Sequence, residues 1–269
     1  MSFGATIKAE SEPGLIVGAE TIDLQSRNSN GILLLHGFGD TPQTLDLLAR
    51  ELHSAGYDVR APLLPGHGEN VAAFAASRRS DWLDHARREL EVMQASHARV
   101  SLVGLSMGGA LAAILAADNR TTPALVLLAP YMEMPITYRM ASVSHWLWGG
   151  VAGTRPTRNR GSIFDPAERE KNLGYGVYSG RLLYELWRLC AAARQSLPSI
   201  ITPTLLMQSP SDPRISPAVA ERTVAALGTS DKRLVWVQGA GHIITVDYGR
   251  GRVFHETVKW IAKYMPATA

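Results

Sequence analysis

Short, continuous apolar runs alternate along this chain with longer amphipathic segments. Apolar runs of this kind are typical of strands buried on both faces of a parallel sheet, and the amphipathic segments are typical of helices that cover such a sheet. The predicted strands are residues 32–35, a strand around Val59, and residues 100–103, 125–128, 205–207 and 234–237. The predicted helices span approximately 42–55, 81–96, 107–117, 218–227 and 250–264. The pattern therefore predicts an α/β fold with a mainly parallel sheet flanked by helices.

The alternation breaks between about Tyr131 and Pro198. This stretch contains tryptophans and tyrosines but no strand-like run, so we expect a mostly helical insertion after the sixth core strand. The predicted organisation is a core of residues 1–130 and 200–269, with residues 131–199 inserted into it. The apolar residues of the insertion are expected to pack onto the core and, in part, to roof a pocket. They are Trp146, Leu147, Trp148, Ile163, Leu173, Leu182, Leu183, Leu186 and Trp187.

The balance of charged and apolar residues is that of an ordinary globular protein. The chain has 269 residues, of which 46% are apolar and 19% charged, and its formal net charge is +3. This length suits one large domain with an inserted lobe. The densest group of basic residues, Arg155, Arg158 and Arg160, lies among Pro, Thr and Gly rather than on a regular face. We therefore expect a solvated loop there, and no nucleic-acid partner.

The single cysteine, Cys190, limits the chemistry and the compartment that we expect. One cysteine cannot form an internal disulfide or a structural zinc site, and its helical surroundings predict a buried, inert thiol. The first 14 residues lack the apolar core of a signal peptide. No apolar run reaches the roughly 18 residues of a membrane span. These features predict a cytoplasmic protein, and no metal site or other cofactor is expected.

The strongest chemical signal is Gly-Leu-Ser-Met-Gly at residues 104–108, between a predicted strand and a predicted helix. In the pattern Gly-x-Ser-x-Gly, the small flanking residues let the chain turn sharply without clashes. The serine hydroxyl is then presented beside a helix N-terminus, whose partial positive charge stabilises an oxyanion. Ser106 is therefore the predicted nucleophile. The alternative, an ordinary loop serine between two packing glycines, is disfavoured because the motif has a strand before it and a helix after it.

A second glycine-containing loop, His-Gly-Phe-Gly at residues 36–39, follows the first predicted strand. Its glycines permit a close backbone approach, so the N–H groups of Phe38 and Met107 are the predicted oxyanion donors. His36 is expected to hold this loop by hydrogen bonds rather than to act as a base. The loop also resembles the start of a dinucleotide-binding fingerprint, but Pro42 stands in place of the last glycine, which excludes that interpretation.

The predicted base and acid come late in the chain. His242 follows a strand and a glycine-rich loop, whereas His67 lies too early for the base and is expected to have a structural role in its loop. Asp212 directly follows the strand at 205–207, where a carboxylate can orient the histidine and stabilise its charged form. Asp247 is the alternative acid, but it lies five residues after His242 and is expected to cap the last helix.

These residues together resemble the α/β-hydrolase superfamily and, more narrowly, the bacterial carboxylesterase and monoacylglycerol lipase family. The likeness covers nearly the whole core and rests on residues 34–42, 55–57, 62–68, 81–82, 104–109, 200–204, 212 and 239–247. The resemblance implies an α/β-hydrolase fold with a triad of Ser106, Asp212 and His242. It also implies that Phe38 and Met107 form the oxyanion hole and that the insertion is a small lid.

The resemblance further implies hydrolysis of carboxylic esters through an acyl-enzyme on Ser106, without a cofactor. We expect Phe38, Tyr131 and Ile243 to contact the substrate. Because the insertion is apolar, medium-chain esters and monoacylglycerols are the expected substrates, and long-chain triacylglycerols are expected to be poor ones.

Three other functions are compatible with part of this pattern. A thioesterase or a carbon–carbon bond hydrolase can use the same triad. Dehalogenases and epoxide hydrolases of this fold need a carboxylate nucleophile, and position 106 is a serine. A non-catalytic, ligand-binding relative is the alternative from another functional class. It is disfavoured because such a protein is expected to have lost part of the triad or the oxyanion loop, and none of these features is missing.

Overall fold

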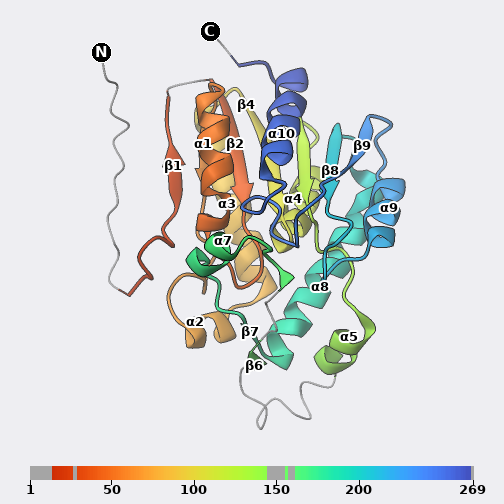
Figure 1. Ribbon diagram of the computed structural model, residues 1–269. Helices are drawn as coiled ribbons and strands as arrows, with labels where there is room; N and C mark the ends of the chain where they lie inside the picture. Colours follow the sequence, from red (N-terminus) through yellow and green to blue (C-terminus); the bar gives the residue numbers. More distant parts are fainter. Residues whose placement is uncertain (1–13, 27–28, 144–154, 157–160, 268–269) are drawn as a thin grey trace.

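The computed structural model describes residues 14–26, 29–143, 155–156 and 161–267 (Figure 1). Within these residues, seven strands form one sheet in the order β1-β3-β2-β4-β5-β8-β9. They are β1 (Ile22–Leu24), β2 (Asn30–Leu35), β3 (Asp58–Ala61), β4 (Arg99–Leu105), β5 (Leu125–Leu128), β8 (Thr204–Gln208) and β9 (Lys232–Trp236). Neighbouring strands are parallel except for β1, which runs antiparallel to β3. The predicted mainly parallel sheet is confirmed.

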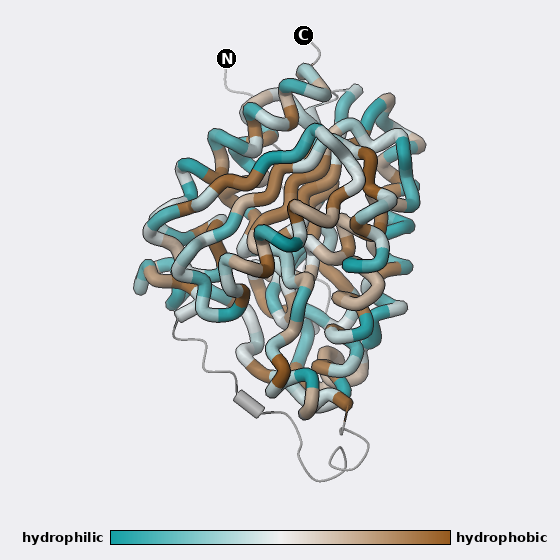
Figure 2. The backbone as a smooth tube through the Cα atoms, turned by 90° about the vertical axis from the view of Figure 1, so that its right-hand side faces the viewer, coloured by the Kyte–Doolittle hydropathy of each residue, from teal (hydrophilic) through white to brown (hydrophobic). Residues whose placement is uncertain are grey.

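Helices cover both faces of the sheet, and each face has its own apolar core. Leu33 and Leu35 of β2 belong to one core, and Ile32 and Leu34 belong to the other, because successive side chains of a strand point to opposite faces. This burial on both sides explains the continuous apolar runs in the sequence. Figure 2 shows the hydrophobic strands in the centre of the molecule, with more polar segments around them.

The two helical layers account for most of the predicted helices. One face is covered by α1 (Asp46–Ser54) and α10 (Arg250–Tyr264), and the other by α3 (Arg79–Ser96), α4 (Met107–Asp118), α8 (Gly180–Ser196) and α9 (Pro217–Ala226). A 3₁₀ turn, η1 (Pro42–Leu45), precedes α1, so the helix predicted from residue 42 begins as a tighter turn. The short helix α2 (Val71–Ala76) was not predicted.

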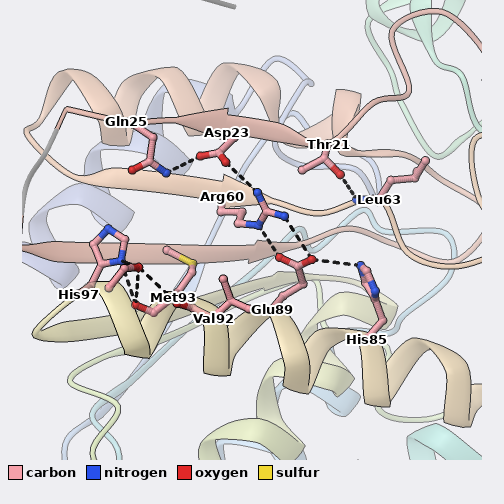
Figure 3. A network of polar contacts seen from close by, with 11 residues as sticks. Thr21, Asp23, Gln25, Arg60, Leu63, His85, Glu89, Val92, Met93 and His97 are labelled. Atoms are coloured by element: carbon pink, nitrogen blue, oxygen red, sulfur yellow. Dashed lines mark hydrogen bonds and ion pairs between the residues drawn. The ribbon is translucent and has the colours of Figure 1, made fainter. Parts of the chain in front are cut away.

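The edge strand β1 was also not predicted, and polar contacts attach it to the sheet (Figure 3). Arg60 of β3 donates to Asp23 over 2.7 Å and also pairs with Glu89 of α3. Just beyond the strand, the Leu63 N–H donates to Thr21 Oγ1 over 3.0 Å. The side chains of β1 are partly exposed. A strand of this kind carries no apolar run, and the hydrophobic pattern therefore does not reveal it.

Within the described residues, the insertion follows β5, the fifth strand of the sheet in chain order, where the prediction counted six core strands. The reason is that the described residues before Asn30 form a single short strand. The elements described within it are α5 (Ile136–Val143), β6 (Arg155–Pro156), α7 (Pro166–Lys171), β7 (Val177–Tyr178), α8 and η3 (Leu197–Ser199). Most of its described residues are helical, and β6 and β7 pair as an antiparallel ribbon.

The helix α8 joins the insertion to the core by packing against α4, and it also packs against α5 of the insertion. Its buried face includes Cys190, and burial raises the pKa of this thiol to about 12, as fits the predicted inert cysteine. In the part of the chain that the structure describes, no helix is long and apolar enough to cross a membrane. Some residues of the sequence-based expectations lie outside the described residues. These are Trp146, Leu147, Trp148, Arg158 and Arg160.

Candidate active site

Ser106 lies at the sharp turn between β4 and α4, with φ 55° and ψ −115°. Few non-glycine residues adopt this conformation, and such strain is concentrated at functional sites. The neighbouring glycines are required by close approach: a Cβ on Gly104 would lie 2.2 Å from the Gly108 carbonyl oxygen. A Cβ on Gly108 would lie 2.0 Å from the carbonyl oxygen of Leu35. The predicted reason for the glycines, avoidance of clashes with strand and helix, therefore agrees with the structure.

The structure brings Ser106, His242 and Asp212 into one hydrogen-bonded chain. Ser106 Oγ lies 2.8 Å from His242 Nε2, and His242 Nδ1 lies 2.7 Å from Asp212 Oδ2. His242 lies on the loop after β9, and Asp212 lies on the turn after β8. All three side chains thus follow the carboxyl ends of strands, which meet at one edge of a parallel sheet. In this geometry His242 can accept the Ser106 proton while Asp212 orients the ring.

The Asp212 carboxylate is buried but well supplied with donors. Its Oδ1 accepts hydrogen bonds from the N–H groups of Arg214 (2.7 Å) and Ile215 (3.1 Å), and its Oδ2 accepts one from Gln208 Nε2 (2.7 Å). Burial acts to raise the pKa of Asp212, but the charge and hydrogen bond of His242, together with these other donors, outweigh burial and lower the pKa. The group is therefore suited to remain ionised beside the imidazole.

The loop at residues 36–39 lies against the nucleophile. A Cβ on Gly37 would be 3.4 Å from Ser106 Cβ, so the loop backbone passes close to the serine. Met107 is the first residue of α4, and its N–H is therefore among those at the helix N-terminus. These positions of Phe38 and Met107 are compatible with the predicted oxyanion hole, whose geometry requires donors about 3 Å from the developing charge.

Two buried histidines hold this loop. His36 Nε2 accepts a hydrogen bond from the Leu64 N–H (3.0 Å), and His67 Nε2 accepts one from the Gly39 N–H (3.1 Å). Each ring donates its Nδ1 proton to a backbone carbonyl, that of Gly37 for His36 and that of Pro65 for His67. Both histidines are therefore neutral, and both hold the loop structurally, which is the role that the sequence predicts.

The neutral state of His67 leads to a prediction about acid stability. Burial lowers the pKa of His67 to about 4, whereas an unfolded histidine titrates near 6.5. Between these values the unfolded chain binds a proton that the folded protein does not, so the free energy of unfolding should fall as the pH drops from about 6.5 to about 4. We expect His67 alone to contribute a loss of about 3 kcal/mol over this window.

Urea unfolding of wild type and His67→Gln, measured across this pH range, tests the prediction. Glutamine keeps an acceptor for Gly39 but does not titrate, so the variant should lose less stability on acidification. His255→Gln, at an exposed position of α10, is the matched control and should follow the wild type. Parallel pH curves for wild type and His67→Gln would contradict the assignment.

The loop that carries His242 is hydrogen-bonded to the insertion. The carbonyl oxygen of Ser162 accepts hydrogen bonds from the N–H groups of both His242 and Ile243, each over 2.9 Å. A Cβ on Gly241 would lie 2.6 Å from the Gly161 carbonyl oxygen, so this contact requires a glycine. Residues 161–162 therefore help to set the position of the histidine.

Asp247 supports the same contact, and its predicted role as a cap of the last helix is wrong. The N-cap of α10 is Gly249, and no side chain caps this helix. The fully buried Asp247 carboxylate instead accepts hydrogen bonds from the N–H groups of Gly241 (2.7 Å), Phe164 (2.8 Å) and Asp165 (2.9 Å). It thereby ties the histidine loop to the insertion. At the start of the helix, the backbone carbonyl of Asp247 accepts a hydrogen bond from the Arg250 N–H over 2.9 Å.

A cavity of about 420 Å³ opens at Ser106 and His242. The three predicted substrate contacts, Phe38, Tyr131 and Ile243, all line it. The insertion supplies much of the remaining lining: Tyr138, Ser162, Ile163, Arg169, Asn172, Gly174, Gly176, Val177, Tyr178, Leu183 and Leu186. The cavity is thus amphipathic, with apolar side chains from α8 and β7 and polar ones from residues 162–172.

Sequence reasoning missed several residues that support this site. Gln208 is a polar residue that ends a buried strand, a signal that could have identified it as a partner of Asp212. Ser162 acts through its backbone carbonyl toward the histidine loop, and no residue type signals that role. Among the described side chains, no three His, Cys, Asp or Glu residues gather as metal ligands would.

Known proteins resemble this chain over most of its length. The family model described as serine aminopeptidase, S33, matches residues 27–248. A thermostable monoacylglycerol lipase of Bacillus sp. (strain H-257) is 26% identical over 234 residues, which are 87% of this chain and 91% of that protein. A carboxylesterase of Bacillus subtilis (strain 168) is 25% identical over 234 residues, covering 86% and 92%. A solved structure from work on the metagenome-derived lipolytic enzymes LipS and LipT has a TM-score of 0.85 and 25% identity, covering 93% of this chain and 99% of that one.

Proposed function

The chain belongs to the family described as serine aminopeptidase, S33, and has the α/β-hydrolase fold; from this premise we propose that it hydrolyses carboxylic esters through an acyl-enzyme on Ser106. It is a carboxylic ester hydrolase, like the lipase and the esterase that it resembles. The proposed mechanism is supported by the hydrogen-bonded chain from Ser106 through His242 to Asp212. Ser106 and His242 also line the cavity.

The first half of the reaction forms the acyl-enzyme. Ser106 Oγ attacks the ester carbonyl carbon as its proton passes to His242 Nε2, 2.8 Å away. The charge that develops on the carbonyl oxygen is stabilised by the N–H groups of Phe38 and Met107. When the tetrahedral intermediate collapses, the carbon–oxygen bond to the alcohol breaks and His242 returns the proton to the leaving oxygen.

The second half releases the acid. A water molecule gives a proton to His242 and attacks the acyl carbon, and the bond to Ser106 Oγ then breaks as the serine regains its proton. Through both halves the Asp212 carboxylate stabilises the charged imidazole, 2.7 Å away.

The substrates that we propose are medium-chain esters and monoacylglycerols. The apolar lining by Leu183, Leu186 and Val177 suits an acyl chain, and the polar lining by Asn172 and Arg169 suits a polar head. A cavity of about 420 Å³ has room for one small ligand but not for three long chains. In this proposal the insertion acts as a lid, because it supplies much of the lining.

We expect the rate constant kcat/KM to rise with acyl length from acetyl to the medium-chain esters. Each buried methylene contributes about 0.8 kcal/mol, so four more can raise kcat/KM by up to about two orders of magnitude. A series of p-nitrophenyl esters from acetyl to palmitoyl, with monoacylglycerols and triacylglycerols beside it, measures this. A steady fall from acetyl onward would refute the apolar pocket while leaving the triad untouched.

A fluorophosphonate probe tests the proposed nucleophile independently of substrate choice. The probe should label Ser106 in the wild type and should not label Ser106→Ala, whereas a non-catalytic binding protein would not be labelled. Acyl-thioesters and amides in the same substrate panel distinguish an esterase from a thioesterase or an amidase.

A cytoplasmic location is part of the proposal, since the only cysteine is a buried free thiol.

A further inference from the structure

Arg214 is a charged side chain at the cavity that the proposed reaction does not use. It lies on the turn after β8, two residues beyond the proposed acid Asp212. Its Nε donates a hydrogen bond to Ser162 Oγ over 2.7 Å, and Ser162 belongs to the insertion, 52 residues away in the chain. Ser162 is buried. Arg214 therefore joins the turn that carries the acid to the insertion.

This contact closes a ring of hydrogen bonds around the proposed acid and base. Asp212 Oδ1 accepts the Arg214 N–H (2.7 Å), and Asp212 Oδ2 lies 2.7 Å from His242 Nδ1. The Ser162 carbonyl oxygen accepts the His242 N–H (2.9 Å), and Ser162 Oγ accepts the Arg214 Nε–H. Asp212 and His242 are thus held together directly and, by a second path, through Arg214 and Ser162.

The backbone segments that carry the ring are also closely packed. A Cβ on Gly161 would lie 3.4 Å from Pro213 Cγ, so the insertion passes directly beside the turn of the acid. A Cβ on Gly241 would lie 2.7 Å from the Ser162 carbonyl oxygen. In packing this close, a displacement of Ser162 is transmitted to His242. A misplacement of about 1 Å can cost an enzyme on the order of 100-fold in rate, so the position of Ser162 matters to the reaction.

The guanidinium charge offers a competing role for Arg214. Burial raises the pKa of Asp40 in the cavity wall, against a hydrogen bond from Asn172 (3.2 Å) and the charge of Arg214. Burial likewise raises the pKa of Tyr131, and the Arg214 charge again acts to lower it. In this competing role Arg214 acts as a cation on the cavity and its ligand. The two roles need different features of the side chain, because the ring needs a donor at Nε and the electrostatic role needs only the charge.

We propose that Arg214 is a positioning residue: through Ser162, its Nε–H holds the insertion and the His242 loop where the imidazole meets both Asp212 and Ser106. This inference rests on the proposed function and adds a residue that aligns the acid and the base. The insertion then takes part in that alignment as well as in lining the cavity.

Three substitutions of Arg214 separate the donor from the charge. In Arg214→Gln, the side-chain Nε2 lies as many bonds from Cα as the arginine Nε, so the donor is kept and the charge is removed. Arg214→Lys keeps the charge but has a methylene in place of Nε, and Arg214→Met has neither. We expect kcat on a medium-chain p-nitrophenyl ester to fall about tenfold in the lysine and methionine variants, because a hydrogen bond from a charged group is lost. Arg214→Gln should recover most of this loss.

Two further measurements report positioning rather than binding. KM should change less than kcat, and the maximal rate of labelling by the fluorophosphonate should fall by the same factor as kcat, since both reactions need Ser106 and His242 in alignment. Ser162→Ala removes the same hydrogen bond from its other end, so its double variant with Arg214→Met should be hardly slower than the slower single one. Arg252→Met, at an exposed position of α10, is the matched control and should keep the wild-type kcat and labelling rate.

The positioning role is overturned if Arg214→Gln loses as much kcat as Arg214→Met, or if Arg214→Met loses none. A wild-type rate in Arg214→Lys beside a slow Arg214→Gln would assign the effect to the charge. Losses confined to KM, or fully additive losses in the double variant, would also overturn it. If Arg214→Met does not fold by circular dichroism, Ser162→Ala and the comparison of Arg214→Gln with Arg214→Lys decide between the two roles. A wild type that resists the fluorophosphonate and cleaves none of the esters would instead overturn the proposed function and with it this inference.

Discussion

Replacing Ser106 or His242 by alanine is expected to lower kcat by roughly 10⁴–10⁶-fold, with the double variant hardly slower than either single one. The reason is that the two side chains act as a unit: the serine is a weak nucleophile unless its proton passes to the histidine at 2.8 Å. The residual rate would come from the oxyanion donors and from substrate binding, which neither substitution removes. Steady-state kinetics on one medium-chain p-nitrophenyl ester measures the effect.

Two substitutions of the same chemical kind serve as controls. Ser80→Ala and His255→Ala lie at exposed positions of α3 and α10 and should retain the wild-type rate. Circular dichroism must show that all variants are folded. A folded Ser106→Ala or His242→Ala protein with near wild-type turnover would refute the assignment of nucleophile and base.

Asp212→Asn is expected to lower kcat by roughly 10³–10⁴-fold while the fold is kept. The asparagine amide would favour the wrong tautomer of His242 and would not stabilise its charged form. The lowered pKa of Asp212 means that the charge is present at neutral pH, where the substitution removes it. The same ester assay, with unfolding by urea beside it, measures both activity and stability.

Asp247→Asn is the matched comparison and should show the opposite balance. Asp247 does not contact the imidazole but accepts hydrogen bonds from the backbone of Gly241, Phe164 and Asp165. An amide nitrogen would face these donors, so we expect about 2–4 kcal/mol of lost stability and a much smaller loss of turnover than for Asp212→Asn. If Asp247→Asn is the slower enzyme and Asp212→Asn the less stable protein, the two roles assigned here are reversed.

The sequence by itself determines the sheet and the residues at its carboxyl edge. The apolar runs indicate β2, β4, β5 and β8 because strands buried on both faces are largely apolar. The turn at Ser106 has a local sequence signal: Gly104 and Gly108 lie two residues on either side of the serine, and a Cβ on Gly104 would meet the Gly108 carbonyl within the same turn. Asp212 and His242 likewise lie in the loops that follow β8 and β9, so the parallel sheet brings them together with Ser106.

Only the tertiary structure decides which residues of the insertion reach the site. Asp40 and Asn172 are 132 residues apart, and Asp247 and Phe164 are 83 apart. These contacts form because the insertion folds back over the edge of the sheet. The sequence around either partner contains no periodic pattern that indicates such a contact. The edge strand β1 escapes prediction for a similar reason, since it is attached by backbone pairing with β3 and by the contact of Asp23 with Arg60, a residue of another strand. Hydrophobic periodicity indicates which face of one segment packs against the core. A polar contact between two segments depends on the tertiary arrangement of both, so periodicity does not indicate it.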